Sequence, residues 1–541
     1  MTSWPPFISA LSARVPGLSA PADGPDISGL AYDSRKVRPG DLFIALPGAR
    51  DDGARFVPDA IQRGAAAVLH QGAPLPHGIP GIRVPDARAS MAAAAAVFYG
   101  DPTRDLDVVG VTGTNGKTTV AFMVRHLLEA AGTPCALVGT VRYEWAGRSV
   151  AADRTTPEAP DLHRIFAEAR AAGQRAAVME VSSQGLCARR LDGVRFSAAV
   201  FTNLTPEHLD YHRDMEHYYA AKRLLFESLE QLQDGGSRCL VSRPGGASSP
   251  SEPFPPSMRL ARSARHTMSG HNAPAAGNRL AAPAIVNADD PYGRRLAAEP
   301  CLAGRPVLRF SLDASSPAEV RAGSVTCAPD ATTFRLLSPW GDADVRLPLI
   351  GRHNIANALA AAAVAGARGI PVETIAAALA TMPGVPGRLE RVDDPVGGRH
   401  LFVDYAHTPD ALENILRTLR ELVRPPARLW CVFGCGGDRD PTKRPVMGRI
   451  AAELADATVL TSDNPRNESP DAILREIRSG MDTRPPVAVI PDRPAAIRET
   501  LRLARPGDLV VVAGKGHETY QEGPHGHRIP LDDRALLRAA L

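Results

Sequence analysis

Short apolar runs alternate with helix-like segments along most of this 541-residue chain. In the first hundred residues, DLFIAL (41–46) and AAVLHQ (66–71) predict strands, and helices are predicted at 56–65 and 88–99. Two strands joined through a helix usually pair in parallel, by a right-handed crossover. The alternation therefore predicts an α/β fold built from parallel sheets.

The same alternation recurs in two further blocks of the chain. The second block predicts strands at 108–113, 135–140, 176–183 and 198–204. The third block begins near residue 387 and contains the strand-like runs LFVDY, RLWCVFG, ATVLTSD, VAVI and LVVVAGKG. Helix-like stretches separate these runs, which is typical of a doubly wound sheet.

The length of the chain and the three blocks predict three domains. At roughly 150 residues per domain, 541 residues are too many for one hydrophobic core. We place the domains at 1–104, 105–386 and 387–541, with GDPTRDL (100–106) as a linker.

Residues 234–280 interrupt the second block. They are rich in Pro, Gly, Ser and Ala and contain few residues that could form a core, so we expect a largely disordered surface insertion. Arg259, Arg262 and Arg265 could form a small basic patch there, although a solvated loop is the preferred interpretation.

The composition excludes several classes of protein. A net charge of +3 is small for this length, so we expect no nucleic-acid partner. No run approaches the roughly 18 apolar residues of a membrane span. The first residues contain no basic region followed by an apolar core, so we expect no secretory signal. Seven scattered cysteines are typical of reduced, buried thiols, so we expect a cytoplasmic protein, and we take it to be a monomer. Cys431 and Cys435 could suggest a metal, but core packing is favoured because no second pair accompanies them.

The stretch VVGVTGTNGKTT (108–119) is similar to a phosphate-binding loop. The strict pattern G-x-x-x-x-G-K-[ST] would need glycine where Val111 stands. A strand, a turn with Gly113 and Gly116, and a helix starting near Lys117 would still aim main-chain N–H groups at an anion. Nucleotide binding is favoured over a glycine-rich turn with a surface lysine.

Polar residues follow two other predicted strands. Glu180 ends one strand, and the next strand is followed by Asn203, His208, Asp210 and His212. Ligands gather at the carboxyl ends of strands in open parallel sheets, and a hard cation there would take the oxygen of Glu180 and could also take His208. A purely structural role for the single carboxylate is about as plausible.

TGTNGKTT resembles the loop of the Mur ligase superfamily, which also includes folylpolyglutamate synthetases. The segments GRHNIANALAA (351–361), VPGRLERV (385–392) and VDYAHTPDAL (403–412) extend the resemblance. It implies a uridine-nucleotide-binding first domain, a central P-loop ATPase-like domain and a Rossmann-like C-terminal domain. The implied ATP-binding residues are Gly113, Thr114, Asn115, Gly116, Lys117, Thr118, Thr119, Asn203, Asn357, Arg388, Asp404 and His407.

The resemblance also implies a metal-assisted active site. In the family, a helix like MEHYYAAKRLLF (215–226) bears a lysine carbamylated by CO₂, which corresponds to Lys222. Thr118 and Glu180 would hold one Mg²⁺ ion, and His208 and carbamylated Lys222 would hold a second. Lys117, Glu180, His208 and Lys222 are thus the expected catalytic residues. Without the resemblance, Lys222 would be a solvated helix lysine.

Two further sets of residues are implied as contacts of a UDP-linked muramoyl dipeptide. DSRKVRPGDLFIALPG (33–48) resembles the uridine-binding segment, and RTTPEAPDLHRIF (154–166) resembles the part that meets the dipeptide. The implied contacts are Ser34, Ala49, Arg50, Asp51, Thr155, Thr156, Ser182 and Arg190. The chain departs from the family pattern at Arg154, Gln184 and Ala188, where asparagine, histidine and glutamine are common.

The incoming amino acid is suggested by DNPR (463–466), which resembles the motif of the diaminopimelate-adding branch of the family. *meso*-Diaminopimelate ends in a second head that bears a carboxylate and an ammonium. Arginine matches a carboxylate bidentately, while carboxylate and amide oxygens suit an ammonium. The implied contacts are Arg439, Asp463, Asn464, Pro465, Arg466, Gly514 and Glu518. Taken alone, DNPR could be only an Asn-Pro turn after a strand.

The resemblance therefore implies an ATP-dependent ligase of peptidoglycan biosynthesis. It would phosphorylate the D-glutamate γ-carboxylate of UDP-N-acetylmuramoyl-L-alanyl-D-glutamate, and the amine of diaminopimelate would displace the phosphate. Closure about a hinge at 386–388 is expected to bring ATP and the amine together. A lysine-adding member, a folylpolyglutamate synthetase and a nucleotide-binding protein without ligase activity remain as alternatives.

Overall fold

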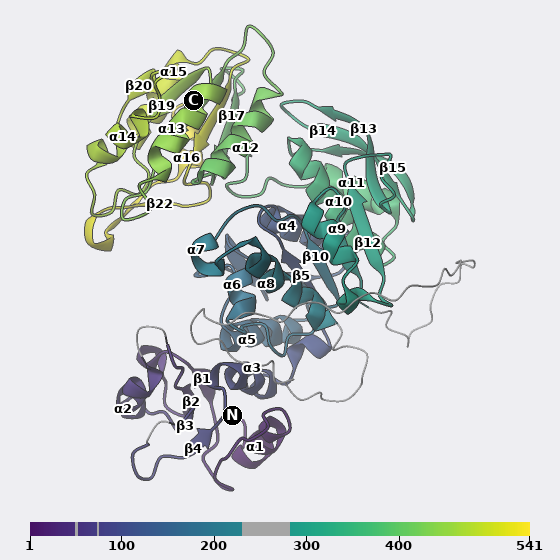
Figure 1. The fold of residues 1–541 in the computed structure, drawn as a ribbon, viewed down its shortest axis with the longest axis vertical. Helices are drawn as coiled ribbons and strands as arrows, with labels where there is room; N and C mark the ends of the chain where they lie inside the picture. Colours follow the sequence, from purple (N-terminus) through teal and green to yellow (C-terminus); the bar gives the residue numbers. More distant parts are fainter. Residues whose placement is uncertain (49–51, 73–74, 230–281) are drawn as a thin grey trace. The chain divides into compact units, whose positions relative to one another are not determined.

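The computed structural model describes residues 1–48, 52–72, 75–229 and 282–541 (Figure 1). The chain forms two compact units. The smaller unit contains residues 1–101 and 191–195, and the larger contains 102–190, 196–229 and 283–541. The predicted insertion at 234–280, with its three arginines and Cys239, lies outside the described residues, as do Ala49, Arg50 and Asp51.

The smaller unit is a parallel four-stranded sheet with the order β1-β2-β3-β4. β2 and β3 are buried along their whole length, as their apolar sequences require, and Asp86 caps α3 by accepting from two main-chain N–H groups. The predicted strands and helices of this block are confirmed. Its elements are α1 (Trp4–Ser12), β1 (Gly29–Ala31), η1 (Ser34–Lys36), β2 (Asp41–Ile44), η2 (Gly53–Phe56), α2 (Val57–Gln62), β3 (Ala67–His70), β4 (Gly81–Arg83) and α3 (Ala87–Phe98).

The central block of the larger unit is built on an eleven-stranded sheet. Its order is β15-β14-β13-β12-β11-β10-β5-β9-β6-β7-β8, and the strands from β13 to β6 are parallel. Antiparallel strands extend both edges. The four predicted strands of this block are confirmed as β5 (Asp107–Thr112), β6 (Cys135–Val138), β9 (Ala176–Glu180) and β10 (Ala198–Phe201).

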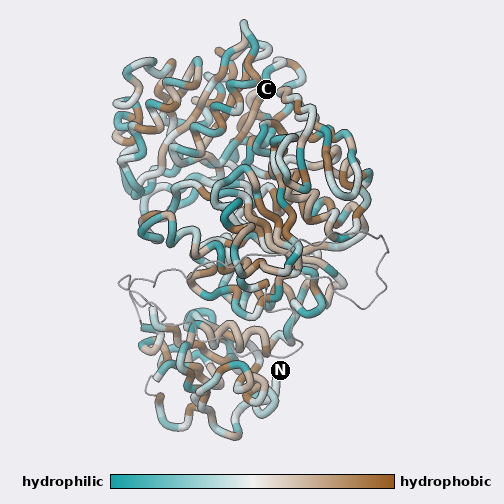
Figure 2. Tube along the Cα trace, turned by 45° about the vertical axis from the view of Figure 1, so that its right-hand side comes forward, coloured by the Kyte–Doolittle hydropathy of each residue, from teal (hydrophilic) through white to brown (hydrophobic). Residues whose placement is uncertain are grey.

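The remaining strands of this sheet were not predicted from the sequence. These are β7 (Arg142–Trp145), β8 (Arg148–Ala151), β11 (Ala284–Asn287), β12 (Val307–Ser311), β13 (Val320–Cys327), β14 (Thr332–Ser338) and β15 (Gly341–Leu347). The helices are α4 (Lys117–Ala130), α5 (Ala159–Ala171), α6 (Ser183–Cys187), α7 (Leu209–His212), α8 (Met215–Glu227), α9 (Pro291–Ala297), α10 (Arg352–Gly366) and α11 (Val372–Ala380), with the short η3 (Pro102–Arg104) and η5 (Pro300–Leu302). One hydrophobic core joins α4, α10 and α11 to the strands, and the sheet interior is hydrophobic (Figure 2).

The C-terminal block is a six-stranded sheet with the order β16-β17-β21-β18-β19-β20. All its strands are parallel except β16. Helices α12, α13 and α14 pack on one face and α15 and α16 on the other, so the predicted doubly wound arrangement is confirmed. The strands are β16 (Glu390–Val392), β17 (His400–Asp404), β18 (Leu429–Phe433), β19 (Ala457–Leu460), β20 (Ala488–Val489) and β21 (Leu509–Ala513). The helices are α12 (Pro409–Arg420), α13 (Lys443–Leu454), α14 (Pro470–Arg478), α15 (Arg493–Leu503) and α16 (Asp533–Ala539); a hairpin of β22 (Tyr520–Glu522) and β23 (Arg528–Pro530) contains η6 (Pro524–Gly526).

The cysteines follow the prediction only in part. Cys431 and Cys435 lie in the C-terminal core, and the Sγ of Cys435 is 3.7 Å from the Sδ of Met447, so the core-packing interpretation is confirmed. Cys187, by contrast, is exposed at the end of α6. No helix in the described part of the chain is long and apolar enough to cross a membrane.

Candidate active site

The phosphate-loop sequence forms the predicted strand, turn and helix. β5 ends at Thr112, and α4 begins at Lys117 directly after Gly116, which has a left-handed φ of 87°. A Cβ at Gly116 would lie 2.5 Å from the Oδ1 of Asn357, so the close approach of Asn357 requires glycine. The first N–H groups of α4 and the positive end of its dipole thus face the loop, an arrangement that favours an anion.

Lys117 bends back over this loop. Its Nζ donates to the main-chain oxygens of Gly113 (2.9 Å) and Thr114 (2.8 Å). Burial lowers the pKa of the Lys117 ammonium, although the charges of Glu180 and Glu207 oppose the shift. An incoming phosphate could replace the two carbonyl oxygens as the partner of this ammonium.

Glu180 lies at the carboxyl end of β9, as predicted, with only 1% of its surface exposed. Its Oε2 accepts from the hydroxyls of Thr118 and Thr140, each at 3.0 Å, and its Oε1 accepts from the main-chain N–H of Thr140 at 2.7 Å. The carboxylate is therefore ordered by neutral donors and stands beside the hydroxyl of the phosphate loop. Oxygen donors of this kind fit a hard cation such as Mg²⁺.

Lys222 is buried on α8, not solvated, with 2% of its surface exposed. Its Nζ donates to the Gly113 oxygen at 2.8 Å and lies 4.5 Å from the centre of the Tyr218 ring. Burial, followed by the charge of Lys117, holds the pKa of the Lys222 ammonium well below its usual value. The neutral amine, which is the nucleophilic form, is thereby favoured.

The polar residues after β10 divide into three roles. The side chain of Asn203 holds Asn115 by accepting from its main-chain N–H (2.9 Å) and donating to its oxygen (3.2 Å). His212 is buried, bonded to the Ser183 hydroxyl at 2.8 Å and stacked on Tyr218. His208 is exposed, with a left-handed φ of 56°, and the described residues contain no cluster of three or more His, Cys, Asp or Glu side chains around it.

The predicted dipeptide contacts of the central block converge near the end of β9. The Thr156 hydroxyl donates to the main-chain oxygen of Glu180 and accepts from the Ser182 N–H and hydroxyl, each at 3.0 Å. Arg190 donates to the Thr156 oxygen at 3.0 Å, and Thr155 lies 3.1 Å from the Thr140 hydroxyl. Four separately predicted residues therefore form one polar cluster.

Arg154, one of the departures from the family pattern, is accommodated locally. Its guanidinium donates to the buried Glu158 carboxylate at 3.0 Å, and the same carboxylate lies 3.0 Å from the Arg190 Nε.

In the smaller unit, Ser34 is buried at the start of η1 and its hydroxyl bonds to Asp59, which lowers the pKa of that carboxyl.

The C-terminal ATP-site candidates gather around Tyr405. Asp404 ends β17, and its carboxylate accepts from the N–H groups of Leu389 (2.7 Å) and Ala406 (2.8 Å), while burial raises its pKa. The Arg388 guanidinium lies 5.4 Å from the centre of the Tyr405 ring, and the Nδ1 of His407 is hydrogen-bonded to the main-chain oxygen of Tyr405 at 2.8 Å. All three predicted residues are thus close to one another.

The predicted amino-acid contacts meet where three loops of the C-terminal sheet come together. A Cβ on Gly436 would touch both Arg466 and Arg439, and one on Gly437 would meet the Pro465 oxygen. Gly514 has a φ of 113° and lies against the Asp463 carboxylate, too closely for a side chain. The Oδ2 of Asp463 is buried without a hydrogen-bond partner among the described residues, so this carboxylate can still accept a donor.

Arg466 is fixed within this cluster. It has a left-handed φ of 49°, its Nε donates to the Glu522 Oε2 at 3.0 Å, and its Nη1 donates to the Gly437 oxygen at 2.7 Å. A backbone conformation of this kind is uncommon for a non-glycine residue and is often found at functional sites. The two contacts leave part of the guanidinium fork available.

Three residues that build this cluster were not predicted from the sequence, namely Lys515, Glu522 and Arg493. Arg493 forms a buried, bidentate pair with Asp533, both bonds being 2.7 Å, and donates to the main-chain oxygens of Ser462 and Ala513. It thereby joins the loops that follow β19 and β21. Lys515 stood in the quoted run LVVVAGKG, but only the folded structure shows that it is buried.

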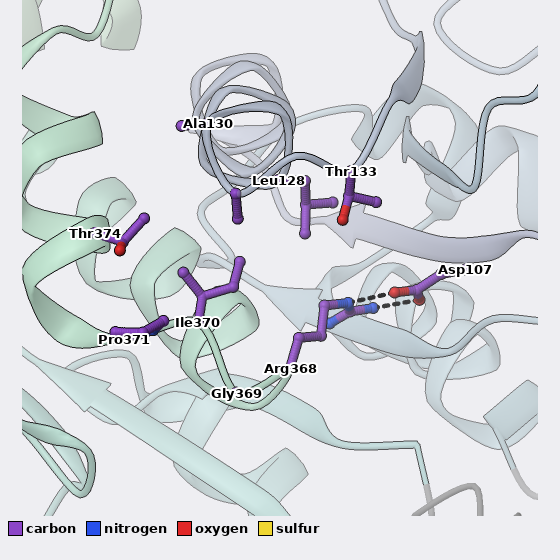
Figure 3. A pocket seen from close by; sticks show the side chains of 10 residues that line it. Asp107, Leu128, Ala130, Thr133, Arg368, Gly369, Ile370, Pro371 and Thr374 are labelled. Atoms are coloured by element: carbon purple, nitrogen blue, oxygen red, sulfur yellow. Dashed lines mark hydrogen bonds and ion pairs between the residues drawn. The ribbon is translucent and has the colours of Figure 1, made fainter. Parts of the chain in front are cut away.

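A cavity of about 680 Å³ lies at the other end of β5, away from the phosphate loop (Figure 3). Arg368 and Asp107 form a bidentate pair there, with both bonds at 2.6 Å. The guanidinium also donates to Ser197 and to the main-chain oxygen of Val364, so four of its five N–H groups donate within the protein. This cavity does not belong to the candidate active site.

Comparisons with known proteins agree with these groupings. Three family models match: "Mur ligase family, catalytic domain" over residues 26–99, "Mur ligase middle domain" over 111–235 and 276–365, and "Mur ligase, glutamate ligase domain" over 387–516. A UDP-N-acetylmuramoyl-L-alanyl-D-glutamate–2,6-diaminopimelate ligase from *Gloeobacter violaceus* is 44% identical over 522 residues, covering 95% of this chain and 94% of the relative.

Solved structures resemble the chain as well. The structure of a UDP-N-acetylmuramoyl-L-alanyl-D-glutamate–2,6-diaminopimelate ligase gives a TM-score of 0.63 at 31% identity, covering 95% of this chain and 94% of the other. MurF ligase from *Thermotoga maritima* in complex with ADP gives a TM-score of 0.59 at 17% identity, covering 90% and 94%, which is a likeness of fold.

Proposed function

Because this chain belongs to the Mur ligase family, we propose that it is the ligase that adds *meso*-2,6-diaminopimelate to UDP-N-acetylmuramoyl-L-alanyl-D-glutamate in peptidoglycan biosynthesis. The reaction converts ATP to ADP and phosphate. The nucleotide-sugar would bind domain 1–104, ATP domain 105–386 and the amino acid domain 387–541. The observation that carries the substrate assignment is the meeting of Arg439 and Arg466 at Gly436, together with an Asp463 carboxylate oxygen that is buried without a hydrogen-bond partner among the described residues.

This cluster suits a head that bears both charges. Arginine donors match the distal carboxylate of diaminopimelate, while Asp463 and Glu518 can accept from its ammonium. The side chain of lysine ends in an ammonium alone, so it would leave the arginine donors without a partner. The same geometry therefore supports diaminopimelate over lysine.

The proposed reaction has two steps. The γ-carboxylate of D-glutamate attacks the γ-phosphorus of ATP, ADP leaves, and an acyl phosphate forms. The neutral amine of diaminopimelate then attacks the acyl carbon, and the tetrahedral adduct loses phosphate and a proton to give the amide. Lys117 and the N–H groups at the start of α4 would hold the charge that develops on the phosphoryl oxygens.

We assign Mg²⁺ to the oxygen donors beside the phosphate loop. Thr118 and Glu180 would hold one ion, and His208 with carbamylated Lys222 would hold the other; the buried Glu180 carboxylate with its neutral partners supports this assignment. The metal would offset negative charge on the phosphates. Asn115, Asn203, Asn357, Arg388, Asp404 and His407 would contact the nucleotide.

Carbamylation of Lys222 is chemically reasonable in this environment. The neutral Nζ would attack the carbon of CO₂, forming an N–C bond, and release of one proton would leave a carbamate anion. The lowered pKa of Lys222 supplies the neutral amine, and the new negative charge would attract Lys117 where the ammonium repelled it. The nearby cation thus favours both the neutral amine and the carbamate, whereas burial favours only the neutral amine.

The function is tested by phosphate release from ATP with purified protein and Mg²⁺. We expect release with the muramoyl dipeptide nucleotide plus *meso*-diaminopimelate, and little with lysine or with folate plus glutamate. Equal rates with lysine would overturn the substrate assignment, and release only with folate and glutamate would identify a folylpolyglutamate synthetase. We further propose that the protein is cytoplasmic and monomeric. Size-exclusion chromatography with light scattering checks the oligomeric state.

A further inference from the structure

We propose that Lys515 determines which amine the C-terminal site accepts, by fixing Asn464 and Glu518 and by adding one positive charge to their surroundings. The inference rests on the proposed function because it concerns the choice between a zwitterionic and a cationic side-chain head. Lys515 is a positioning residue, since it is fully buried and acts through its neighbours.

The Lys515 ammonium is enclosed by three partners. Its Nζ donates to the Oδ1 of Asn464 at 2.9 Å and to the Oε2 of Glu518 at 2.8 Å, and it lies 5.6 Å from the centre of the Tyr520 ring. Burying an ammonium is costly unless it is paired and hydrogen-bonded. These contacts meet that requirement with two residues that the sequence analysis places at the amino-acid site.

Lys515 fixes the orientation of the Asn464 amide. The Oδ1 of Asn464 accepts from the Lys515 Nζ and from the main-chain N–H of Glu522 at 2.9 Å, while its Nδ2 donates to the Glu518 Oε2 at 3.1 Å. Reversing the amide would place an NH₂ group against two donors. The lysine therefore determines which face of Asn464 is offered to a ligand.

Lys515 also divides the two oxygens of Glu518. Oε2 accepts from both Lys515 and Asn464, whereas no hydrogen bond to Oε1 occurs among the described residues. The Glu518 side chain retains 17% exposure. Oε1 is thus the oxygen that remains for an incoming ammonium.

The charges of the site balance when the pairs are counted. Lys515 pairs with Glu518 and Arg466 pairs with Glu522, which leaves Arg439 and Asp463 as a matched cation and anion. The distal head of diaminopimelate, with one ammonium and one carboxylate, adds no net charge. The side chain of lysine adds one positive charge, which Lys515 opposes by Coulomb repulsion.

The test is the ratio of kcat/KM for *meso*-diaminopimelate to kcat/KM for L-lysine in the wild type, Lys515→Met and Lys515→Gln. We expect the ratio to fall at least about tenfold in Lys515→Met, because a hydrogen bond to a charged group and a positive charge are lost together. Lys515→Gln can still bond to Asn464, so its KM for diaminopimelate should rise less while the ratio still falls. The KM for ATP should stay at the wild-type value in both variants.

Arg528→Met is the matched control. Arg528 lies on β23, which pairs with the strand β22 that contains Tyr520, and its guanidinium is 4.1 Å from the centre of the Tyr520 ring. It makes no hydrogen bond to Asn464 or Glu518. Its removal deletes one positive charge from the neighbourhood without touching the network. We expect its amine ratio to stay within about twofold of the wild type.

The outcomes separate the two hypotheses. If the wild type forms product with neither diaminopimelate nor lysine, or favours lysine, the proposed function is wrong and this inference is wrong with it. If the wild type prefers diaminopimelate and Lys515→Met retains the same ratio, only the role of Lys515 is wrong. If neither variant at Lys515 folds with a normal KM for ATP, Lys515 is a structural residue and the proposal is also wrong.

Discussion

Cations occupy both candidate binding regions of the larger unit, but they are bound differently. In the central block, the Lys117 and Lys222 ammonium groups donate to main-chain oxygens of the phosphate loop. Neither has a carboxylate within ion-pair distance among the side chains that the structure describes. In the C-terminal block, Lys515, Arg466 and Arg493 each pair with a carboxylate.

This difference separates two uses of positive charge. A buried cation that is bound only by carbonyl oxygens has a lowered pKa, as both central lysines do. Its charged form is stabilised most when an anion binds beside it. A cation that is already paired with a carboxylate attracts a further anion less strongly, and it contributes instead by positioning its neighbours and by its share of the site's net charge. We therefore expect the central cations to control phosphoryl transfer with every amine, and the C-terminal cations to control which amine is accepted.

The largest effect is expected at Lys117. Lys117→Met should lower kcat about 10³-fold with either amine, because it removes a donor to the transferring phosphoryl group. Arg125→Met is the control, since Arg125 lies on the same helix and pairs with Glu129 and Glu144. Steady-state ADP release measures both. A Lys117 variant that lost activity with only one amine would contradict the proposed division between the two blocks.

The next effect is expected at Lys222. Lys222→Ala should lose about 10²-fold in kcat and regain activity with short carboxylic acids, which can replace a carbamate, while Lys117→Met should not be rescued. The chain has only five lysines, so ¹³CO₂ labelling followed by NMR should give a carbamate signal that Lys222→Ala abolishes. Full activity of Lys222→Ala would rule out the carbamate.

The two blocks also differ in what their sequences made predictable. β5 and α4 were placed within one residue at the phosphate loop because a strand, a glycine turn and a helix leave a local pattern. The strands β13 and β15 were missed because their few buried positions are separated by partly buried or exposed ones and both strands include charged residues, so no continuous apolar run marks them. Local patterns thus predicted the parallel strands of the central sheet better than its antiparallel edge.

The supporting residues of the C-terminal site could not be predicted from local patterns. Lys515 bonds to Asn464 across 51 positions, Arg466 to Glu522 across 56, and Arg493 to Asp533 across 40. Residue types suggested which side chains would meet a zwitterion. Which carboxylate neutralises which cation depends on the order of β17, β21, β18 and β19, and that order becomes known only with the fold.

An intermediate effect is expected at the Arg466–Glu522 pair. Arg466→Met should raise the KM for diaminopimelate about tenfold to a hundredfold, because a charged hydrogen bond to the ligand is lost. Glu522→Gln should raise the KM for diaminopimelate by a smaller factor, since Arg466 remains and loses only its charged partner. If Glu522 acts through Arg466, the double variant should match Arg466→Met alone in a double-mutant cycle. Additive effects would show that Glu522 acts independently.

The smallest effect concerns His517, two residues after Lys515, whose Nδ1 is buried without a hydrogen-bond partner among the described residues. Burial, together with the charge of Arg388, lowers the pKa of its imidazole from 6.5 to about 4. Between these values the unfolded chain binds a proton that the folded protein does not, so the free energy of unfolding falls as the pH drops from 6.5 towards 4. His517→Asn should lose this dependence, reducing the acid-induced loss by about 1 kcal/mol after allowance for partial exposure. Denaturant unfolding at pH 7.5 and 4.5 measures the difference, with His77→Asn as an exposed control. An unchanged pH dependence in His517→Asn would mean that this histidine can bind a proton in the folded C-terminal site, which would then carry an additional positive charge in acid.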